Sequence, residues 1–318
     1  MILRISDLKP NQNYEGCLAV KKAELAQARN SSTYLKLTLT DGMHEIFAKF
    51  WNYEGEVPLS DQIIKVGGRV EQYQSYYQMI LNSWQEASQD DYDPAEFIPR
   101  SSRSQEEMLL ELQNWIEKVE NTALKYLLHQ TFASAADHGI IETFAICPAA
   151  ISHHHNYLGG LLEHSLEVTA MAYKIASETT CNLDLVITGS LLHDVGKIEE
   201  YSWQGTSIKM TERGMLLGHV VLGIMYLNPK ILDNKELSHE LGSQLLHIIG
   251  AHMGKLEWGA IKEPMTVEAQ IVHTADLASS ELHKFKSAKG KRVKGASFIY
   301  SKELGRNIWV GKGDDESE

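Results

Sequence analysis

The chain has 318 residues, of which 43% are hydrophobic and 23% are charged, and its formal net charge is -12 at pH 7. This length is sufficient for two domains of ordinary size, and we expect two. The negative charge excludes a protein that coats nucleic acid through overall attraction, because phosphates are repelled at long range. No run approaches the roughly 18 consecutive apolar residues of a membrane span. The three cysteines lie far apart without a CxxC pair, which favours a reducing, cytoplasmic compartment.

Residues 12–88 predict a small all-β domain. Runs rich in β-branched and aromatic residues alternate there with turn signals. We predict five strands, at 16–20, 34–40, 43–50, 63–70 and 76–84. Five short strands of this kind suggest an OB-like barrel, an architecture whose exposed face often binds single-stranded nucleic acid.

The most clearly defined part of this domain is a hairpin centred on Asp41-Gly42, a pair with the chemistry of a two-residue type I′ turn. Such a turn would pair Leu37 with Ile46 on an apolar inner face. The outer face would carry two rings and two amines, those of Tyr34, Lys36, Phe47 and Lys49. Rings that stack on bases and amines that bind phosphates make a sequence-tolerant strand-binding surface, although an ordinary solvated sheet face fits the same pattern.

Residues 91–104 contain two prolines and a serine cluster, a composition typical of an exposed linker. Helical periodicity begins at Ser104, which opens an S-x-x-E capping box. Further helices are predicted at 122–136, 160–178, 184–195, 214–227, 237–252 and 266–283. The fold class is therefore a multidomain α and β protein. We divide it into an OB-like nucleic-acid-binding domain at 1–90, a linker at 91–104, an all-α domain at 105–310 and an acidic tail at 311–318.

Five places in the helical part put a metal-capable side chain on or beside an apolar helix stripe. These side chains are His164, the adjacent pair His193-Asp194, His219, His252 and Asp276. A single inward histidine is more often a hydrogen-bonded core residue, but the adjacent pair favours a metal. Both members can reach one ion near a helix end, which Gly196 supplies. Imidazole and carboxylate ligands suit Mn²⁺, Fe²⁺, Co²⁺, Ni²⁺ or Zn²⁺.

The order of these residues, with HisAsp followed closely by GlyLys and then a distal Asp, resembles the HD phosphohydrolase superfamily. The resemblance implies that a first metal is bound by His164, His193, Asp194 and Asp276. His219 and His252 fall where binuclear members bind a second metal, with Asp194 as the bridge. Two such ions activate water at neutral pH and neutralise charge that develops on phosphorus, which favours hydrolysis of a phosphate ester.

Other side chains near these ligands are candidates for contact with the substrate. The resemblance implies that Lys197 contacts a phosphate, although an ordinary exposed lysine just past a helix end fits the same position. We therefore treat Asp194 and Lys197 as the catalytic candidates. His155, from a run of three histidines, and His273, one turn before Asp276, are the candidates for substrate contact.

Nearly the whole chain is similar to the YhaM family of bacterial 3′→5′ exoribonucleases. The similarity rests on the OB-like domain, the linker and the segments HHHNYLGGLLEHSL, LLHDVGK and AHMGKLEWG. It implies that single-stranded RNA is shortened from its 3′ end to nucleoside monophosphates, with Mn²⁺ or Co²⁺ as cofactor. The basic segment 283–294, with six Lys or Arg and no acid, would help to guide the strand. Two departures, Ala251 for an expected Ser and Met253 for an expected His, bear on the substrate more than on metal binding.

Two other functions fit the same residues. The first is an HD phosphohydrolase that acts on a nucleotide or a cyclic dinucleotide, which would not need residues 1–90 for turnover. The second is a non-catalytic RNA-binding regulator, which the near-complete ligand set argues against. The sequence leaves open RNA against single-stranded DNA, one metal against two, the general acid and the subunit number, and it is compatible with a homo-oligomer.

Overall fold

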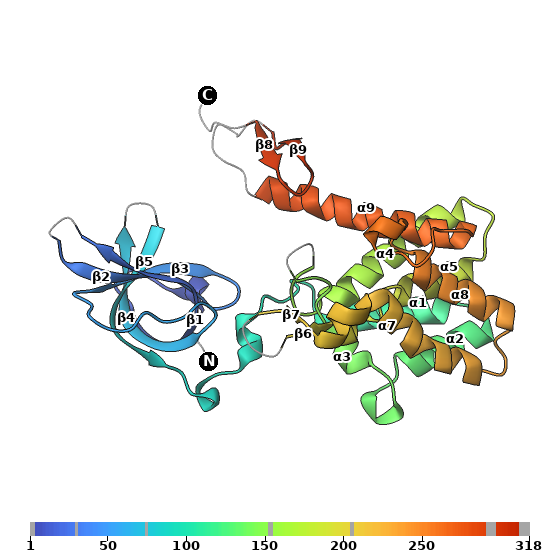
Figure 1. The fold of residues 1–318 in the computed structure, drawn as a ribbon, viewed down its shortest axis with the longest axis horizontal. Helices are drawn as coiled ribbons and strands as arrows, with labels where there is room; N and C mark the ends of the chain where they lie inside the picture. Colours follow the sequence, from blue (N-terminus) through green and yellow to red (C-terminus); the bar gives the residue numbers. More distant parts are fainter. Residues whose placement is uncertain are drawn as a thin grey trace. The chain divides into compact units, whose positions relative to one another are not determined.

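A computed structural model describes residues 4–28, 31–73, 76–151, 155–203, 207–290 and 297–311 of the chain (Figure 1). The chain divides into two units. The first consists of Met1–Arg100 with Ser202–Lys209, and the second of Ser101–Tyr201 with Met210–Glu318. The first unit is built around a β barrel and the second is mostly helical, so the predicted fold class is confirmed.

The barrel closes through five strands in the order β1-β2-β3-β5-β4. Their bounds are β1 Asn13–Gln27, β2 Thr33–Thr40, β3 Glu45–Trp51, β4 Ile63–Tyr73 and β5 Tyr76–Glu86. The parallel pairing of β3 with β5 closes the barrel, and the other neighbours are antiparallel. Alternate residues of each strand point inward, and the core they form includes the fully buried Leu18, Leu35 and Ile64. A closed five-stranded barrel of this kind is the OB-like architecture.

The turn between β2 and β3 differs from the predicted type I′ turn. Thr40 pairs with Glu45, so four residues join the strands instead of two. The carboxylate of Asp41 explains the longer loop, because its Oδ1 accepts hydrogen bonds from the backbone N–H groups of Met43 at 3.0 Å and His44 at 2.8 Å. Asp at such a position commonly bonds the backbone two or three residues on, which stabilises a wider turn.

The longer loop also changes the register of the hairpin. Leu37 pairs with Ala48, so the predicted pairing of Leu37 with Ile46 is wrong, and on the other face Lys36 stands opposite Lys49. A shift of two residues leaves each side chain on its own face of the sheet, because side chains alternate with a period of two. The apolar inner face and the polar, aromatic outer face are therefore as predicted.

Part of the predicted linker packs against the barrel. Tyr92 and Phe97 make an edge-to-face contact with ring centroids 5.8 Å apart. Phe97 is buried in a small cluster with Ala19 and Ile63. The backbone here includes the short 3-10 helix Pro94–Phe97, and the two aromatic contacts hold this segment on the barrel instead of leaving it freely exposed.

The second unit contains nine described α-helices. They are α1 Gln105–Lys118, α2 Thr122–Thr131, α3 Ile141–Ile146, α4 Gly160–Ser177, α5 Leu183–Leu192, α6 Lys197–Glu200, α7 Glu212–Asp233, α8 His239–Ala251 and α9 Val267–Gly290. Ser104 caps α1 as predicted, with its hydroxyl accepting from the N–H of Glu107. Helix α4 packs against α5 and α9, and α8 contacts α5, α7 and α9. A short hairpin, β6 Tyr201–Ser202 with β7 Lys209–Met210, precedes α7, and a second one, β8 Phe298–Ser301 with β9 Arg306–Trp309, contacts α9 (Figure 1).

Helix α7 is the one described helix long and apolar enough, by length and composition alone, to cross a membrane. The helix is interrupted at Gly218, whose φ of 69° and ψ of 158° are non-helical, and it contains Pro229. The residue after the interruption, His219, turns toward Asp194, which follows α5, and His252, which follows α8, and this ties α7 into the helical unit.

Candidate metal centre and nucleic-acid face

His193 and Asp194 reach the same space because α5 ends just before them. The last residue of α5 is Leu192, one turn earlier than predicted, and both side chains follow it in a turn. Gly196 then allows a close approach of α7, since a Cβ at this position would lie 2.0 Å from the carbonyl oxygen of His219. The local sequence thus places His219 beside Asp194.

One oxygen of Asp194 faces the first group of ligands. Its Oδ2 lies 3.4 Å from Nε2 of His164 and 3.3 Å from Nε2 of His193. Nε2 of His164 also lies 3.1 Å from Oδ1 of Asp276 on α9. The ligand atoms of His164, His193 and Asp276 all lie within 4.8 Å of one another. Helices α4 and α9 and the turn after α5 therefore contribute to one compact set of metal-capable atoms.

The other oxygen of Asp194 faces the second group. Its Oδ1 lies 3.4 Å from Nε2 of His219 and 3.5 Å from Nε2 of His252. Behind His219, Oε1 of Glu200 accepts a hydrogen bond from the backbone N–H at 2.9 Å and lies 3.2 Å from the ring Nδ1. Asp194 is thus shared between two candidate positions for an ion.

The orientation of the histidines fits divalent metal ions. Nδ1 of His193 and Nδ1 of His252 each donate to a backbone carbonyl at 2.7 Å. A carbonyl can only accept, so Nδ1 carries the proton and Nε2 presents a lone pair to the centre. Nε2 of His193 lies 3.3 Å from that of His164, and Nε2 of His219 lies 3.4 Å from that of His252. Facing lone pairs repel each other unless a cation lies between them, so this donor set suits two cations.

The charges of the centre also favour the binding of cations. Burial alone would raise the pKa of Asp194, but the ammonium of Lys197 and the ring of His193 lower it well below its usual range. Burial lowers the pKa of His164 and of His252, which keeps both rings neutral. At His193 burial also lowers the pKa, but the carboxylate of Asp194 outweighs it and the pKa is raised. Because a metal ligand must be unprotonated, a metal ion and a proton compete for this ring.

The ligands open onto a cleft of about 410 Å³. Lys197 lines this cleft, with its Nζ 2.6 Å from Oδ2 of Asp194. His273 lines it as well, and its Nδ1 donates to the carbonyl of His252 at 2.7 Å. Trp258, which is 44% exposed, stands in the same wall, with its ring 6.4 Å from that of His273. The cleft therefore brings one predicted catalytic residue and one predicted substrate contact next to the ligands.

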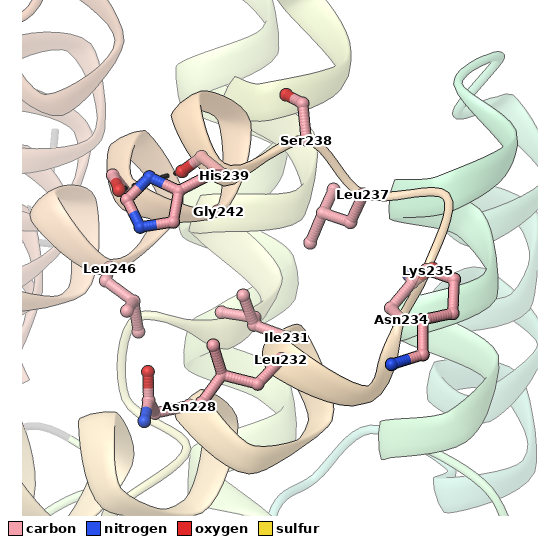
Figure 2. A pocket seen from close by; sticks show the side chains of 11 residues that line it. Asn228, Ile231, Leu232, Asn234, Lys235, Leu237, Ser238, His239, Gly242 and Leu246 are labelled. Carbon is pink, nitrogen blue, oxygen red and sulfur yellow. Dashed lines mark hydrogen bonds between the residues drawn. The ribbon is translucent and has the colours of Figure 1, made fainter.

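A second pocket, of about 290 Å³, lies where α7 ends and α8 begins (Figure 2). Figure 2 shows that Ile231, Leu237 and Leu246 line it, with His239 at the start of α8. Its lining contains none of the predicted site residues. We therefore place the chemistry in the larger cleft.

On the barrel, the outer face of β2 and β3 carries the four predicted nucleic-acid-binding side chains. Phe47 is 52% exposed, and Tyr34 packs on Trp51 with ring centroids 4.8 Å apart. Nζ of Lys49 lies over the ring of Trp51 at 5.4 Å. Lys36 differs from Lys49, because its Nζ forms an ion pair with Glu24 at 3.0 Å.

Further aromatic rings extend this surface beyond the predicted residues. Tyr73 lies under Nζ of Lys49 at 5.0 Å and packs on Tyr76 with centroids 5.6 Å apart, while Tyr76 also contacts Phe47 at 6.0 Å. We call Tyr34, Phe47, Lys49, Trp51, Tyr73 and Tyr76 the aromatic face of the barrel. It is a continuous patch of stacking rings with one amine in the middle.

Comparison with known proteins bears on both regions. The family model described as HD domain matches residues 161–280. These residues are an HD domain. A second model, TraI_2, whose description names a helicase, matches residues 101–189.

The resemblance to the YhaM family is confirmed by relatives that match most of the chain. The 3'-5' exoribonuclease YhaM of Listeria innocua is 29% identical over 285 residues, covering 88% of this chain and 89% of that protein. The 3'-5' exoribonuclease YhaM of Oceanobacillus iheyensis is 29% identical over 282 residues, with coverages of 86% and 85%. Among solved structures, the second OB-fold domain of replication protein A from Methanococcus maripaludis is 21% identical, with a TM-score of 0.23. The match covers 28% of this chain and 97% of that one.

His155 lies behind the ligands of the HD domain instead of in the cleft wall. It is 1% exposed, and its ring centroid is 5.4 Å from that of His164. Its Nδ1 lies 2.8 Å from the hydroxyl of Tyr157 and its Nε2 3.3 Å from Oε2 of Glu167. This position suits support of the ligand set better than direct contact with a substrate. Its two preceding histidines lie outside the described residues.

The sequence analysis missed the groups that hold the HD-domain histidines from behind. Glu200 holds His219, and the hydroxyl of Ser279 lies 3.4 Å from Nδ1 of His164 while it donates to Glu167 at 3.1 Å. Glu167 follows His164 by three residues and so shares its side of α4, which is a signal that could have indicated it. Glu200 and Ser279 give no such signal, because their contacts are made across the fold.

Proposed function

We propose that this chain is a metal-dependent 3′→5′ exoribonuclease that hydrolyses phosphodiester bonds of single-stranded RNA and releases nucleoside monophosphates. The observation that carries the proposal is the set of four histidines and two aspartates centred on Asp194. This set lies in an HD domain, and relatives named 3'-5' exoribonuclease match most of the chain.

The residues of the cleft suit such a reaction. Divalent cations, when bound, supply Lewis acidity toward a phosphodiester and lower the pKa of water. Asp194 shares its two oxygens between both ligand groups, and Lys197 places an ammonium at the cleft wall, where it can contact a phosphate. Because Nδ1 of His273 donates to a backbone carbonyl, Nε2 is the ring nitrogen left to form a hydrogen bond with the substrate. The flat rings of His273 and Trp258 offer surfaces for a terminal nucleotide.

The proposal also specifies the metal ion, the nucleic acid that is bound and the cellular compartment. We take Mn²⁺ as the working metal, with Co²⁺, Fe²⁺, Ni²⁺ and Zn²⁺ compatible with the same imidazole and carboxylate ligands. The OB-like domain, 1–90, would bind the strand through its aromatic face, and the HD phosphohydrolase domain, 105–310, would cleave it. RNA is the proposed substrate, single-stranded DNA is a weaker alternative, and the cytoplasm is the proposed location.

The test is incubation of a single-stranded RNA, labelled at its 5′ end, with the protein and Mn²⁺. We expect a ladder that shortens from the 3′ end and release of nucleoside monophosphates. A double variant with His193→Ala and Asp194→Asn should leave the RNA intact. Intact RNA together with hydrolysis of free nucleotides would instead favour a nucleotide phosphohydrolase. Unchanged RNA processing in cells that carry the double variant in place of the unmodified protein would favour a non-catalytic regulator.

A further inference from the structure

The C-terminal hairpin of β8 and β9 presents three aromatic rings to solvent. Phe298, Tyr300 and Trp309 are 60%, 64% and 62% exposed. Phe298 pairs with Trp309 across the ladder, and Tyr300 follows Phe298 by two residues, so the three rings lie on one face. We call these three residues the aromatic face of the hairpin. Clustered exposed rings of this size are typical of binding surfaces.

The other face of the hairpin holds it on α9 (Figure 1). Ile308 on that face is only 3% exposed. The guanidinium of Arg306 lies 5.5 Å from the ring of Phe285, and its Nη2 lies 3.8 Å from Oε2 of Glu281. The hairpin is thus anchored through one face, and its three exposed rings are not needed to pack it.

The anchor of the hairpin is also the wall of the metal cleft. Glu281 and Lys284 on α9 line the cleft, together with Asp276 of the first ligand group. Phe285 follows Asp276 by nine positions, which at about 1.5 Å per residue is roughly 13.5 Å along the helix. A strand whose end lies at the ligands and which leaves the cleft along α9 would therefore meet the hairpin next.

The charge of the neighbouring sequence favours a nucleic acid as the ligand of this face. The segment 283–294 contains six Lys or Arg and no acidic residue, in a chain whose formal net charge is -12. Amines that bind phosphates beside rings that stack on bases are the requirement for sequence-tolerant binding of a single strand.

We propose that the aromatic face of the hairpin binds bases of the RNA strand a short distance upstream of the 3′ end held in the metal cleft. This inference rests on the proposed function, because it takes the 3′ end to occupy the cleft. It adds a second strand-binding surface, on the HD-domain side of the chain, to the aromatic face of the barrel.

The experiment compares the full-length protein with a triple variant carrying Phe298→Ala, Tyr300→Ala and Trp309→Ala. The affinity for a fluorescently labelled single-stranded RNA is measured with a chelator present, so that the strand is not cut. We expect the dissociation constant to rise at least about fivefold, since stacking of one base on a ring is worth about 1–3 kcal/mol. Hydrolysis of the small diester bis(p-nitrophenyl) phosphate with Mn²⁺ should stay unchanged.

Two further variants serve as controls. Tyr126→Ala removes a ring on α2 that is 53% exposed and is not among the residues of the cleft wall, and it should leave the affinity unchanged. Trp309→Phe keeps a stacking ring and should retain most of the affinity. An affinity of the triple variant equal to that of Tyr126→Ala would overturn the proposal. Equal affinity with loss of a dimer in sedimentation would assign the face to a contact between copies instead.

Failure of this inference can be told apart from failure of the proposed function. Weaker binding by the triple variant, with no 3′ shortening by the unmodified protein, would sink the exoribonuclease proposal and still support the hairpin as a strand-binding surface. Full 3′ shortening together with unchanged affinity in the triple variant would sink only the inference about the hairpin.

Discussion

The metal centre and the aromatic face of the barrel hold their side chains in opposite ways. His193 and His252 are 0% and 1% exposed, and each is fixed by a hydrogen bond to a carbonyl. Phe47 and Trp51 are 52% and 40% exposed, and each packs on another exposed or half-buried ring. Chemistry requires groups fixed before the substrate arrives, whereas stacking tolerates small adjustments. Substitutions in the metal centre should therefore nearly abolish activity, whereas substitutions on the barrel should reduce RNA affinity in small steps.

The largest effect should come from Asp194→Asn, which weakens both ligand groups at once. We expect the rate of RNA shortening to fall at least about a thousandfold, since loss of about 4 kcal/mol of transition-state stabilisation has this effect. The metal content per chain, measured by elemental analysis, should fall with it. Asp233→Asn, at an exposed position at the end of α7, is the matched control. If Asp194→Asn kept the rate of the unmodified protein, substitutions in the metal centre would not have the large effect expected of them.

A smaller effect is expected from His219→Ala, which touches only the second ligand group. The metal content should fall from two ions to one per chain, because the group around His164 keeps its ligands. His247→Ala is a suitable control, since Nε2 of His247 accepts from the N–H of Met265 outside the ligand set. Elemental analysis that still finds two ions in His219→Ala would show that this histidine is no ligand.

On the barrel, the two lysines should differ in a graded way. Lys49→Ala should reduce the slope of log affinity for single-stranded RNA against log salt by about 0.7, the value for one phosphate contact on a single strand. Lys36→Ala should reduce the slope less, because its ammonium is already paired with Glu24. Titrations at several salt concentrations measure both slopes. Equal slopes for the two variants would mean that the ion pair with Glu24 does not decide which lysine binds phosphate.

The smallest effect is expected on the free energy of unfolding, from substitution of Glu167, the carboxylate behind His164. Burial raises the pKa of Glu167, but the ring of His155 and the hydroxyl of Ser279 outweigh it and lower the pKa from 4.5 to about 2. A depressed pKa stabilises the folded state above the unfolded pKa, and this stabilisation is lost as the pH falls through the folded value. The difference in free energy of unfolding between the unmodified protein and Glu167→Gln should therefore shrink between pH 4.5 and about 2. Denaturant titrations across this range measure it, and a constant difference would contradict the assignment.

Much of the candidate centre could be predicted from the sequence because its ligands lie on or beside apolar helix stripes. The stripe that carries His164 inward is a local property of α4, and its period is visible in the sequence. The partners behind the ligands are not local. Glu200 meets His219 only because α7 is interrupted at Gly218 and approaches Gly196 closely.

In the barrel, too, contacts between residues distant in the sequence could not be predicted. Its strands and faces follow from alternating residues, but its hairpin register does not follow from the Asp41-Gly42 pair. The side chain of Asp41 also accepts a hydrogen bond from the N–H of Ile5, which lies 36 residues earlier in the chain. A turn that is shaped by such a distant contact cannot be read from its own four residues.

The shared carboxylate of Asp194 makes the two ligand groups one thermodynamic unit. An ion on one oxygen changes the charge that the other oxygen offers, so loading at one position alters the affinity of the other, and by reciprocity the coupling is equal in both directions. The ammonium of Lys197, 2.6 Å from one of these oxygens, competes for the same negative charge. Metal titrations of this protein should therefore deviate from the curve for two independent sites.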